Sequence, residues 1–201
     1  PVAMSLDALG NRWYLLLMRD MLWAGPQTRQ VLIECNPGLS EHVLDEATDL
    51  LVAHGLIHRL EEPKARFALT ERGEGISQVI SALFDFGLPL LSEVTVNDWM
   101  LKYALSDTAR RRRLDLLEIE HRSIIHMTVD EADLCVEVSP GMLRVVEGHQ
   151  ADATLTMSGA SLAALMGAST TAAELHAAGR LHIVGDADCV SVLLELLPAT
   201  H

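Results

Sequence analysis

The residues that could support acid–base chemistry are a few carboxylates and histidines near the middle of the sequence. Glu118 and His121 are three positions apart, and His126 alternates with apolar neighbours in a segment typical of a strand. A carboxylate that orients a histidine is an arrangement that a general base needs. These three residues are therefore the candidate catalytic groups: Glu118, His121 and His126. The sequence leaves open whether the protein is an enzyme.

Neither a metal ion nor a cofactor is expected from the motifs. The nine histidines form no HExxH or similar ligand spacing, and there is no phosphate loop or dinucleotide-binding fingerprint. Three widely spaced cysteines suit neither a disulfide framework nor a zinc knuckle. Because no signal-peptide pattern opens the sequence either, we expect a cytoplasmic location.

The charge balance disfavours a protein that holds phosphate backbones by bulk positive charge. The 201 residues include 15 Lys and Arg against 28 Asp and Glu, a formal net charge of −13. Apolar residues make up 49% of the chain, which is enough for a folded core. The longest uncharged run, residues 153–173, carries seven Ser or Thr hydroxyls and two glycines, so no membrane span is expected.

Three helices and a hairpin are predicted in the first half of the chain. Apolar residues recur at three- and four-residue intervals from Leu6 to Met21, and a short helix is expected over residues 27–34. Ser40 is a good N-cap for a third helix that ends at His54. Two strands, 56–60 and 66–70, and a long helix over 71–91 follow. This order is that of a winged helix-turn-helix.

The first half also carries local motifs of one family. The segments LGNRWYLLLMR (9–19), PGLS (37–40) and LTERG (69–73) resemble those of HxlR-type winged-helix regulators. The resemblance implies a homodimeric repressor or activator, paired through its first and fourth helices, that places the third helix in the major groove. The residues that would then contact DNA are Ser40, His42, Arg59, Lys64 and Arg66.

The exposed face of the predicted third helix departs from that family pattern. The positions expected to point away from the core are Glu41, His42, Asp45, Glu46, Thr48, Asp49 and Val52. Four-residue spacing places four carboxylates on one side of the helix. Carboxylates repel phosphates and donate no hydrogen bonds to base edges. The fold therefore suggests DNA as a partner, and this face argues against it.

The second half has a different pattern. Helices are expected over 97–105 and 108–118, and alternating strands begin at Ser123, with helices among and after them. The segments ADATLT (151–156) and AGRLHIVGD (178–186) resemble the sterol-carrier-protein-2-like (SCP2-like) domain. The fold class is therefore α+β: a winged helix-turn-helix domain (1–92), connecting helices (93–121) and an SCP2-like antiparallel sheet covered by helices (122–201).

The SCP2-like resemblance implies an apolar cavity that holds a hydrophobic small molecule. The candidate ligand-binding residues are Trp23, Trp99, Tyr103, Met127, Met157, Met166 and Leu181. The same side chains would also suit an ordinary core. Two functions follow from the sequence: a transcription regulator that senses a hydrophobic molecule, or a winged-helix scaffold that has lost DNA binding. In the second case the protein binds a hydrophobic metabolite or transforms it by a cofactor-free cyclisation or isomerisation.

Overall fold

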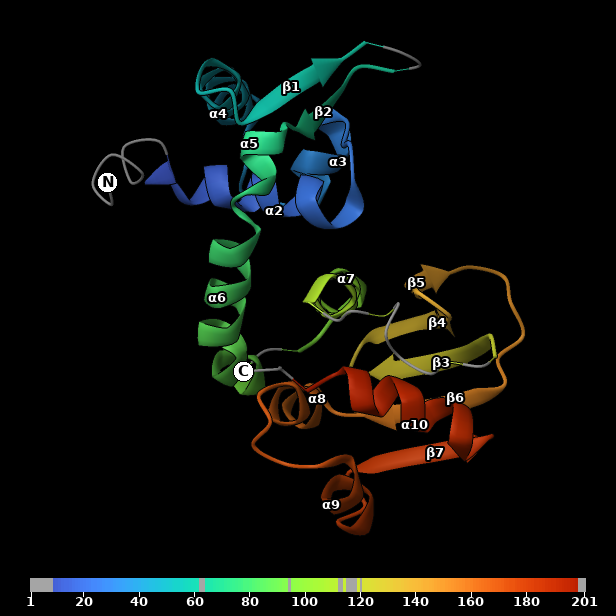
Figure 1. The fold of residues 1–201 in the computed structure, drawn as a ribbon. Coiled ribbons are helices and arrows are strands. Elements are labelled where there is room, and N and C mark those ends of the chain that lie inside the picture. The colour runs from blue at the N-terminus through green and yellow to red at the C-terminus, as the bar shows by residue number, and fades with distance from the viewer. Residues whose placement is uncertain are drawn as a thin grey trace. The chain divides into compact units, whose positions relative to one another are not determined.

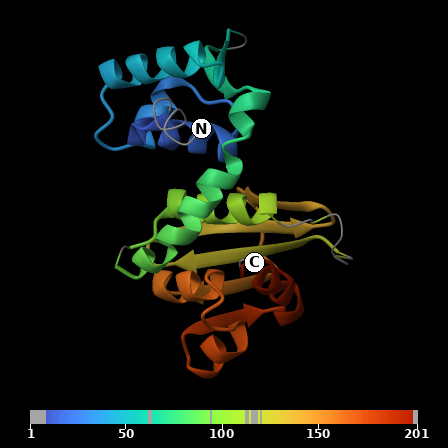
Figure 2. The ribbon, with the colours of Figure 1, turned by 60° about the vertical axis from the view of Figure 1, so that its left-hand side comes forward.

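The structure is a computed structural model that describes residues 9–61, 64–93, 95–111, 114, 119 and 121–198. The chain divides into two compact units, residues 1–83 and 84–201, and each is described by itself. Figures 1 and 2 show the elements of both units from two directions.

The N-terminal unit contains the predicted helices and hairpin. Its elements are α2 (Arg12–Ala24), α3 (Arg29–Glu34), α4 (Glu41–Ala53), β1 (Ile57–Leu60), β2 (Arg66–Leu69) and α5 (Glu71–Glu74). β1 and β2 pair in antiparallel register and form the wing. Side chains of Asn11, Thr28 and Ser40 cap α2, α3 and α4, so a polar residue starts each helix and the predicted Ser40 cap is confirmed.

One core holds this unit together. Leu17 and Met18 of α2 and Leu44 and Leu51 of α4 have no exposed side-chain surface, and Leu32 of α3 joins them. The apolar stripes read from the sequence are therefore the faces that pack. The winged helix-turn-helix prediction is confirmed for this unit.

The long helix predicted over residues 71–91 is wrong, because the segment is broken twice. α5 ends at Glu74, α6 covers Ser77–Gly87, and a 3-10 helix, η1, covers Leu88–Glu93. Gly75 caps the first break. Gly87 and Pro89 lie at the second, where proline has no N–H for an α-helical hydrogen bond.

The two helices predicted over 97–105 and 108–118 are a single helix in the described residues. This helix, α7, covers Asp98–Arg111. Thr108 continues the helix because its hydroxyl donates to the carbonyl of Ala104 at 2.9 Å and so stays satisfied while buried. The predicted continuation through Arg112, Arg113 and Glu118 lies outside the described residues.

The C-terminal unit is built on a five-stranded sheet in the order β5-β4-β3-β6-β7, so β5 and β7 are its outer strands. The strands are β3 (Ser123–Val129), β4 (Ala132–Ser139), β5 (Met142–Val146), β6 (Ala153–Met157) and β7 (Leu181–Gly185). Three pairings are antiparallel, as expected, but β3 and β6 are parallel. The helices are α8 (Gly159–Met166), α9 (Ala172–Ala177) and α10 (Ala187–Leu196).

The helices of this unit pack on the sheet, as Figures 1 and 2 show. α7 contacts β4 and β5, while α10 contacts β3, β6 and β7. Alternate strand residues such as Met127 and Leu155 are fully buried in this core, whereas Val184 on β7 is 70% exposed. The predicted α+β class is confirmed. In the part of the chain that the structure describes, no helix is both long and apolar enough to cross a bilayer.

Candidate functional site

Helix α4 presents the exposed acidic face that the sequence predicted. The side chains of Glu41 and Asp49 are 82% and 69% exposed. Thr48, expected on this face, is instead fully buried, because it follows Leu44 by one turn and precedes Leu51 by another. Its hydroxyl donates to the Asp45 carbonyl at 3.1 Å.

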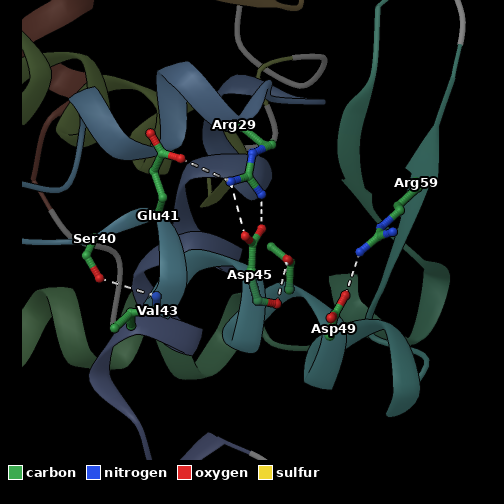
Figure 3. Close-up of polar contacts among 8 residues, drawn as sticks. Arg29, Ser40, Glu41, Val43, Asp45, Asp49 and Arg59 are labelled. Carbon is green, nitrogen blue, oxygen red and sulfur yellow. Dashed lines mark hydrogen bonds and ion pairs between the residues drawn. The ribbon is translucent and has the colours of Figure 1, made fainter.

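The carboxylates at the start of α4 hold an arginine from the neighbouring helix α3 (Figure 3). The guanidinium of Arg29 binds both carboxylate oxygens of Asp45, one of them from Nη2 at 3.3 Å. Nη2 also lies 3.9 Å from Glu41. Glu41 and Asp45 of the predicted recognition helix thus neutralise Arg29.

A second arginine, on the wing, is held in the same way. Arg59 of β1 binds Asp49 at 2.5 Å, and its guanidinium lies 5.7 Å from the centroid of the Phe67 ring (Figure 3 shows the ion pair). Near the start of the helix, His42 faces Glu46 at 3.5 Å. The face therefore presents four carboxylates and two arginines already bound to carboxylates.

These exposed ion pairs have an electrostatic effect more than a stabilising one. An exposed pair contributes about 0–1 kcal/mol to stability because water and salt screen it. Its larger effect is on recognition, since a guanidinium bound to a carboxylate must exchange that partner before it can bind a phosphate. We therefore expect the α4 surface, with these ion pairs formed, to bind DNA weakly.

The remaining candidate DNA contacts have different structural roles. Ser40 accepts from the N–H of Val43 at 3.3 Å and so caps α4 (Figure 3), Lys64 is exposed near the wing tip, and Arg66 is half-buried on β2. Arg72 donates to the carbonyl of His54 at 3.0 Å, which places a cation at the end of α4.

The C-terminal unit contains a pocket of about 450 Å³ between the start of β3, the end of β4 and the start of α10. Its described lining combines charged and apolar side chains: Ile119, His121, Arg122, Ser123, Val138, Asp152, Asp186, Asp188, Cys189 and Val192. The volume lies within the range of small-molecule sites, about 300–1,000 Å³.

Arg122 in this lining is held by a buried carboxylate of β4. Glu137 is 4% exposed, and its carboxylate binds the guanidinium of Arg122 at 3.1 and 3.2 Å and that of Arg144 at 3.1 Å. The hydrogen bonds from Arg122, then from Arg144, hold the pKa of Glu137 below its ordinary value against the opposing effect of burial. The hydrogen bond from Arg122 to Glu137 also raises the pKa of Arg122.

Cys189 forms part of the pocket floor as a thiol. Burial, followed by the charges of Asp186, Asp152 and Asp188, raises its pKa. Its sulfur donates to the Asp186 carbonyl at 3.0 Å. Such a thiol is protonated and a weak nucleophile at neutral pH.

The sequence-predicted ligand residues are not gathered in this pocket. Met127, Met157, Met166 and Leu181 are at most 4% exposed and belong to the core of the C-terminal unit. Trp99 and Tyr103 lie one turn apart on α7, with ring centroids separated by 6.0 Å. Trp23 packs on the core of the N-terminal unit.

The two candidate catalytic histidines that the structure describes have different surroundings. His121 lines the pocket, His126 on β3 pairs with Asp133 of β4, and Glu118 lies outside the described residues. The described residues contain no group of three His, Cys, Asp or Glu side chains placed to hold a metal ion. No motif in the sequence indicated a role for Arg29, Asp186 or Asp188, because their roles depend on neighbours far along the chain.

Comparison with known proteins finds a different family model matching each half. The family described as HxlR-like helix-turn-helix matches residues 8–94, and the family described as Alkyl sulfatase C-terminal matches residues 116–201. An uncharacterised helix-turn-helix-type transcriptional regulator of Synechocystis sp. is 30% identical over 97 residues, which cover 46% of this chain and 71% of the relative.

Two solved structures resemble the separate halves. A MarR-family regulator from Porphyromonas gingivalis W83 is 26% identical with a TM-score of 0.41, covering 44% of this chain and 89% of that one. Sterol carrier protein 2-like 2 from Aedes aegypti is 14% identical with a TM-score of 0.36, covering 47% of this chain and 94% of that one.

Proposed function

Because this chain belongs, through its N-terminal half, to the HxlR-like helix-turn-helix family, we propose that it is a transcription regulator whose C-terminal unit binds a hydrophobic small molecule. The observation that carries the proposal is the combination of a winged helix with a separate unit that contains a pocket of about 450 Å³. A ligand there would regulate DNA binding only if it binds one state of the protein better than another.

A second function is favoured by the α4 surface. Asp45, with Glu41 at its side, and Asp49 bind two arginines beside the helix, Arg29 and Arg59. A winged helix in this state supplies few free donors for phosphates. The alternative is a family member that has lost DNA binding and uses the scaffold to bind, or transform, a hydrophobic metabolite.

Fluorescence anisotropy with mixed genomic DNA fragments separates the two functions. For a regulator we expect binding at about 20 mM salt that weakens as salt increases, because phosphate contacts release counterions. No binding under these conditions would contradict the regulator and leave the scaffold. Native mass spectrometry of the protein from its source then tests whether an apolar ligand copurifies.

A variant that lacks three carboxylates of α4 tests whether these carboxylates prevent DNA binding. Glu41→Gln, Asp45→Asn and Asp49→Asn together free Arg29 and Arg59, so DNA affinity at low salt should rise at least tenfold. Two new phosphate contacts should steepen the plot of log affinity against log salt by about 2. The matched control is Glu71→Gln, Glu74→Gln and Glu61→Gln, which removes three charges elsewhere in the same unit. An equal gain in the control would show that only total charge matters.

We also propose that the protein is a homodimer joined through α6. Val79, Leu83 and Phe86 are 48%, 50% and 83% exposed on this helix, and Leu90 in η1 is 60% exposed. Their spacing of four, three and four residues is that of a helix–helix seam. A second copy of the chain presents the same stripe, so the two can cover each other.

A further inference from the structure

We propose that the pocket of the C-terminal unit selects a ligand with a positively charged head and an apolar body, such as an alkylammonium compound. The inference rests on the proposed binding of a hydrophobic molecule and adds the charge of that molecule. It is carried by the arrangement of one apolar floor, three carboxylates and one arginine that is already bound to a glutamate around the same cavity of about 450 Å³.

The mouth of the pocket is acidic. Asp152, Asp186 and Asp188 all line it, and all three residues are exposed at its rim. Asp152 accepts from the N–H of Ile124 at 2.8 Å, and Asp186 accepts from the N–H of Asp188 at 3.0 Å. These bonds fix two of the three carboxylates in place, so the rim is preorganised for a cation.

The cation in the lining offsets this charge only in part. Arg122 is bound through two nitrogens to Glu137, at 3.1 and 3.2 Å, and Glu137 is shared with Arg144. An alkyl sulfate or a fatty acid would compete with Glu137 for this guanidinium and would approach three carboxylates. A cationic head meets the carboxylates without breaking any described ion pair of the pocket.

The floor of the pocket suits an apolar body. Ile119, Val138 and Cys189 are buried members of the C-terminal core, and Val192 packs against it. The three carboxylates also act together on the Cys189 thiol, whose pKa they raise after the effect of burial. Their fields therefore converge on the floor that an apolar chain would cover.

The test compares three probes that share a ten-carbon chain: decyltrimethylammonium, decan-1-ol and decyl sulfate, each below its micelle concentration and at about 150 mM salt, where long-range attraction to surface charge is screened. Titration calorimetry and amide NMR of the full chain give affinity, stoichiometry and location. We expect one cation site per chain, shifts at residues 121–123 and 186–192, and binding at least tenfold tighter than that of decyl sulfate.

Matched variants locate the charge effect. Asp186→Asn with Asp188→Asn should abolish most of the preference for the cation, and the fold should persist because asparagine is also a good N-cap for α10. Glu41→Gln with Glu46→Gln, which removes two exposed carboxylates from α4, should leave the preference unchanged.

Each result has a distinct meaning. Equal binding of all three probes, tighter binding of decyl sulfate, or an unchanged preference in the Asp186 and Asp188 variant would overturn the charge inference while the pocket remains a hydrophobic site. Cation shifts spread over α4 as much as over α10 would overturn it too. If no probe binds, the proposed ligand-binding function itself is wrong.

Discussion

At the residue scale, the N-terminal unit depends on a buried carboxylate that serves no recognition role. Asp20 on α2 is 2% exposed and accepts from Arg19 at 2.7 and 2.9 Å. It also accepts from the amide of Asn36 at 2.6 Å, and the same amide donates to the Leu32 carbonyl at 2.8 Å. This network joins α2 to the turn that follows α3.

Asp20→Ala is expected to lower the free energy of unfolding by about 3–5 kcal/mol, because the part-buried Arg19 guanidinium loses its carboxylate and the buried Asn36 amide loses one of its two acceptors. Urea unfolding measures the change. The control, Asp49→Ala, removes one side of an exposed pair and should cost less than about 1 kcal/mol. Similar losses in both variants would contradict the role given to Asp20.

Glu137 should make stability depend on pH. Its pKa in the folded protein lies below the ordinary value of 4.5, mainly because Arg122 donates to it, so its contribution is present above pH 4.5 and is lost as pH falls through the lower folded value. Glu137→Gln should therefore destabilise the protein at pH 7 and converge with wild type in acid. Urea unfolding from pH 7 to pH 3 checks this.

Glu147→Gln is the control for that series, since Glu147 is exposed just after β5. Its unfolding free energy should stay close to wild type at each pH. A constant difference between Glu137→Gln and wild type across the series would show that the ionisation of Glu137 is not responsible.

Sequence reasoning identified the acidic residues of the site but not their partners. The exposure of Glu41, Asp45 and Asp49 follows from helix periodicity, which acts over a few residues. Their pairing with Arg29 and Arg59 depends on how α3 and β1 pack beside α4, and periodicity contains no information on that packing. A cavity was expected in this unit, but most of its lining was missed for the same reason, since Arg122, Asp152 and Asp186 come from three separate segments.

At the element scale, a close approach of α5 to the chain before β1 fixes the wing. A Cβ atom on Gly73 would lie 1.9 Å from the carbonyl oxygen of Leu56, so only glycine fits there. The Thr70 hydroxyl, which caps α5, also donates to the carbonyl of Gly55 at 2.7 Å. The start of α5 and the end of α4 are thereby held together.

Gly73→Ala should destabilise the protein by about 3 kcal/mol, at the upper end of overpacking costs, because the neighbour is backbone and cannot rotate away. Thermal or urea unfolding provides the value. Gly75→Ala is the matched control: Gly75 has a helical φ of −58°, and its nearest contact for a Cβ is 3.2 Å away. That variant should be neutral or slightly stabilising, and the reverse order would refute the steric account.

The elements themselves were largely readable from the sequence because their signals are local. Ser40 caps α4 and Thr171 caps α9, and in each case the side-chain oxygen accepts from the backbone N–H three residues later. The long helix over 71–91 failed because its apolar periodicity outweighed the local break signals, Gly75 after α5 and Gly87 with Pro89 after α6. The parallel β3–β6 pair depends on where the chain returns after β5, which strand alternation does not specify.

At the scale of the whole molecule, the proposed dimer can be tested through the α6 stripe. Wild type should sediment at twice the chain mass, and Phe86→Asp should shift it toward the monomer, because the change places a charge in an apolar seam. Phe86 is 83% exposed in the single chain, so its replacement leaves the core intact.

Val184→Asp is the control, as it introduces the same charge at another exposed apolar position, 70% exposed on β7. Its sedimentation should match wild type. A monomeric wild type, or equal dissociation in both variants, would exclude α6 as the seam.

The outer strand β7 also affects the protein at high concentration. An unpaired strand edge offers N–H and carbonyl groups to any second chain, and sheets of separate molecules can merge along it. β7 stops after five residues at Gly185, whose φ of +99° turns the backbone before Asp186 starts α10. The brevity of this edge limits sheet-to-sheet aggregation, so changes that straighten residues 185–186 should promote fibrous association, and they should also alter the pocket because Asp186 lines it.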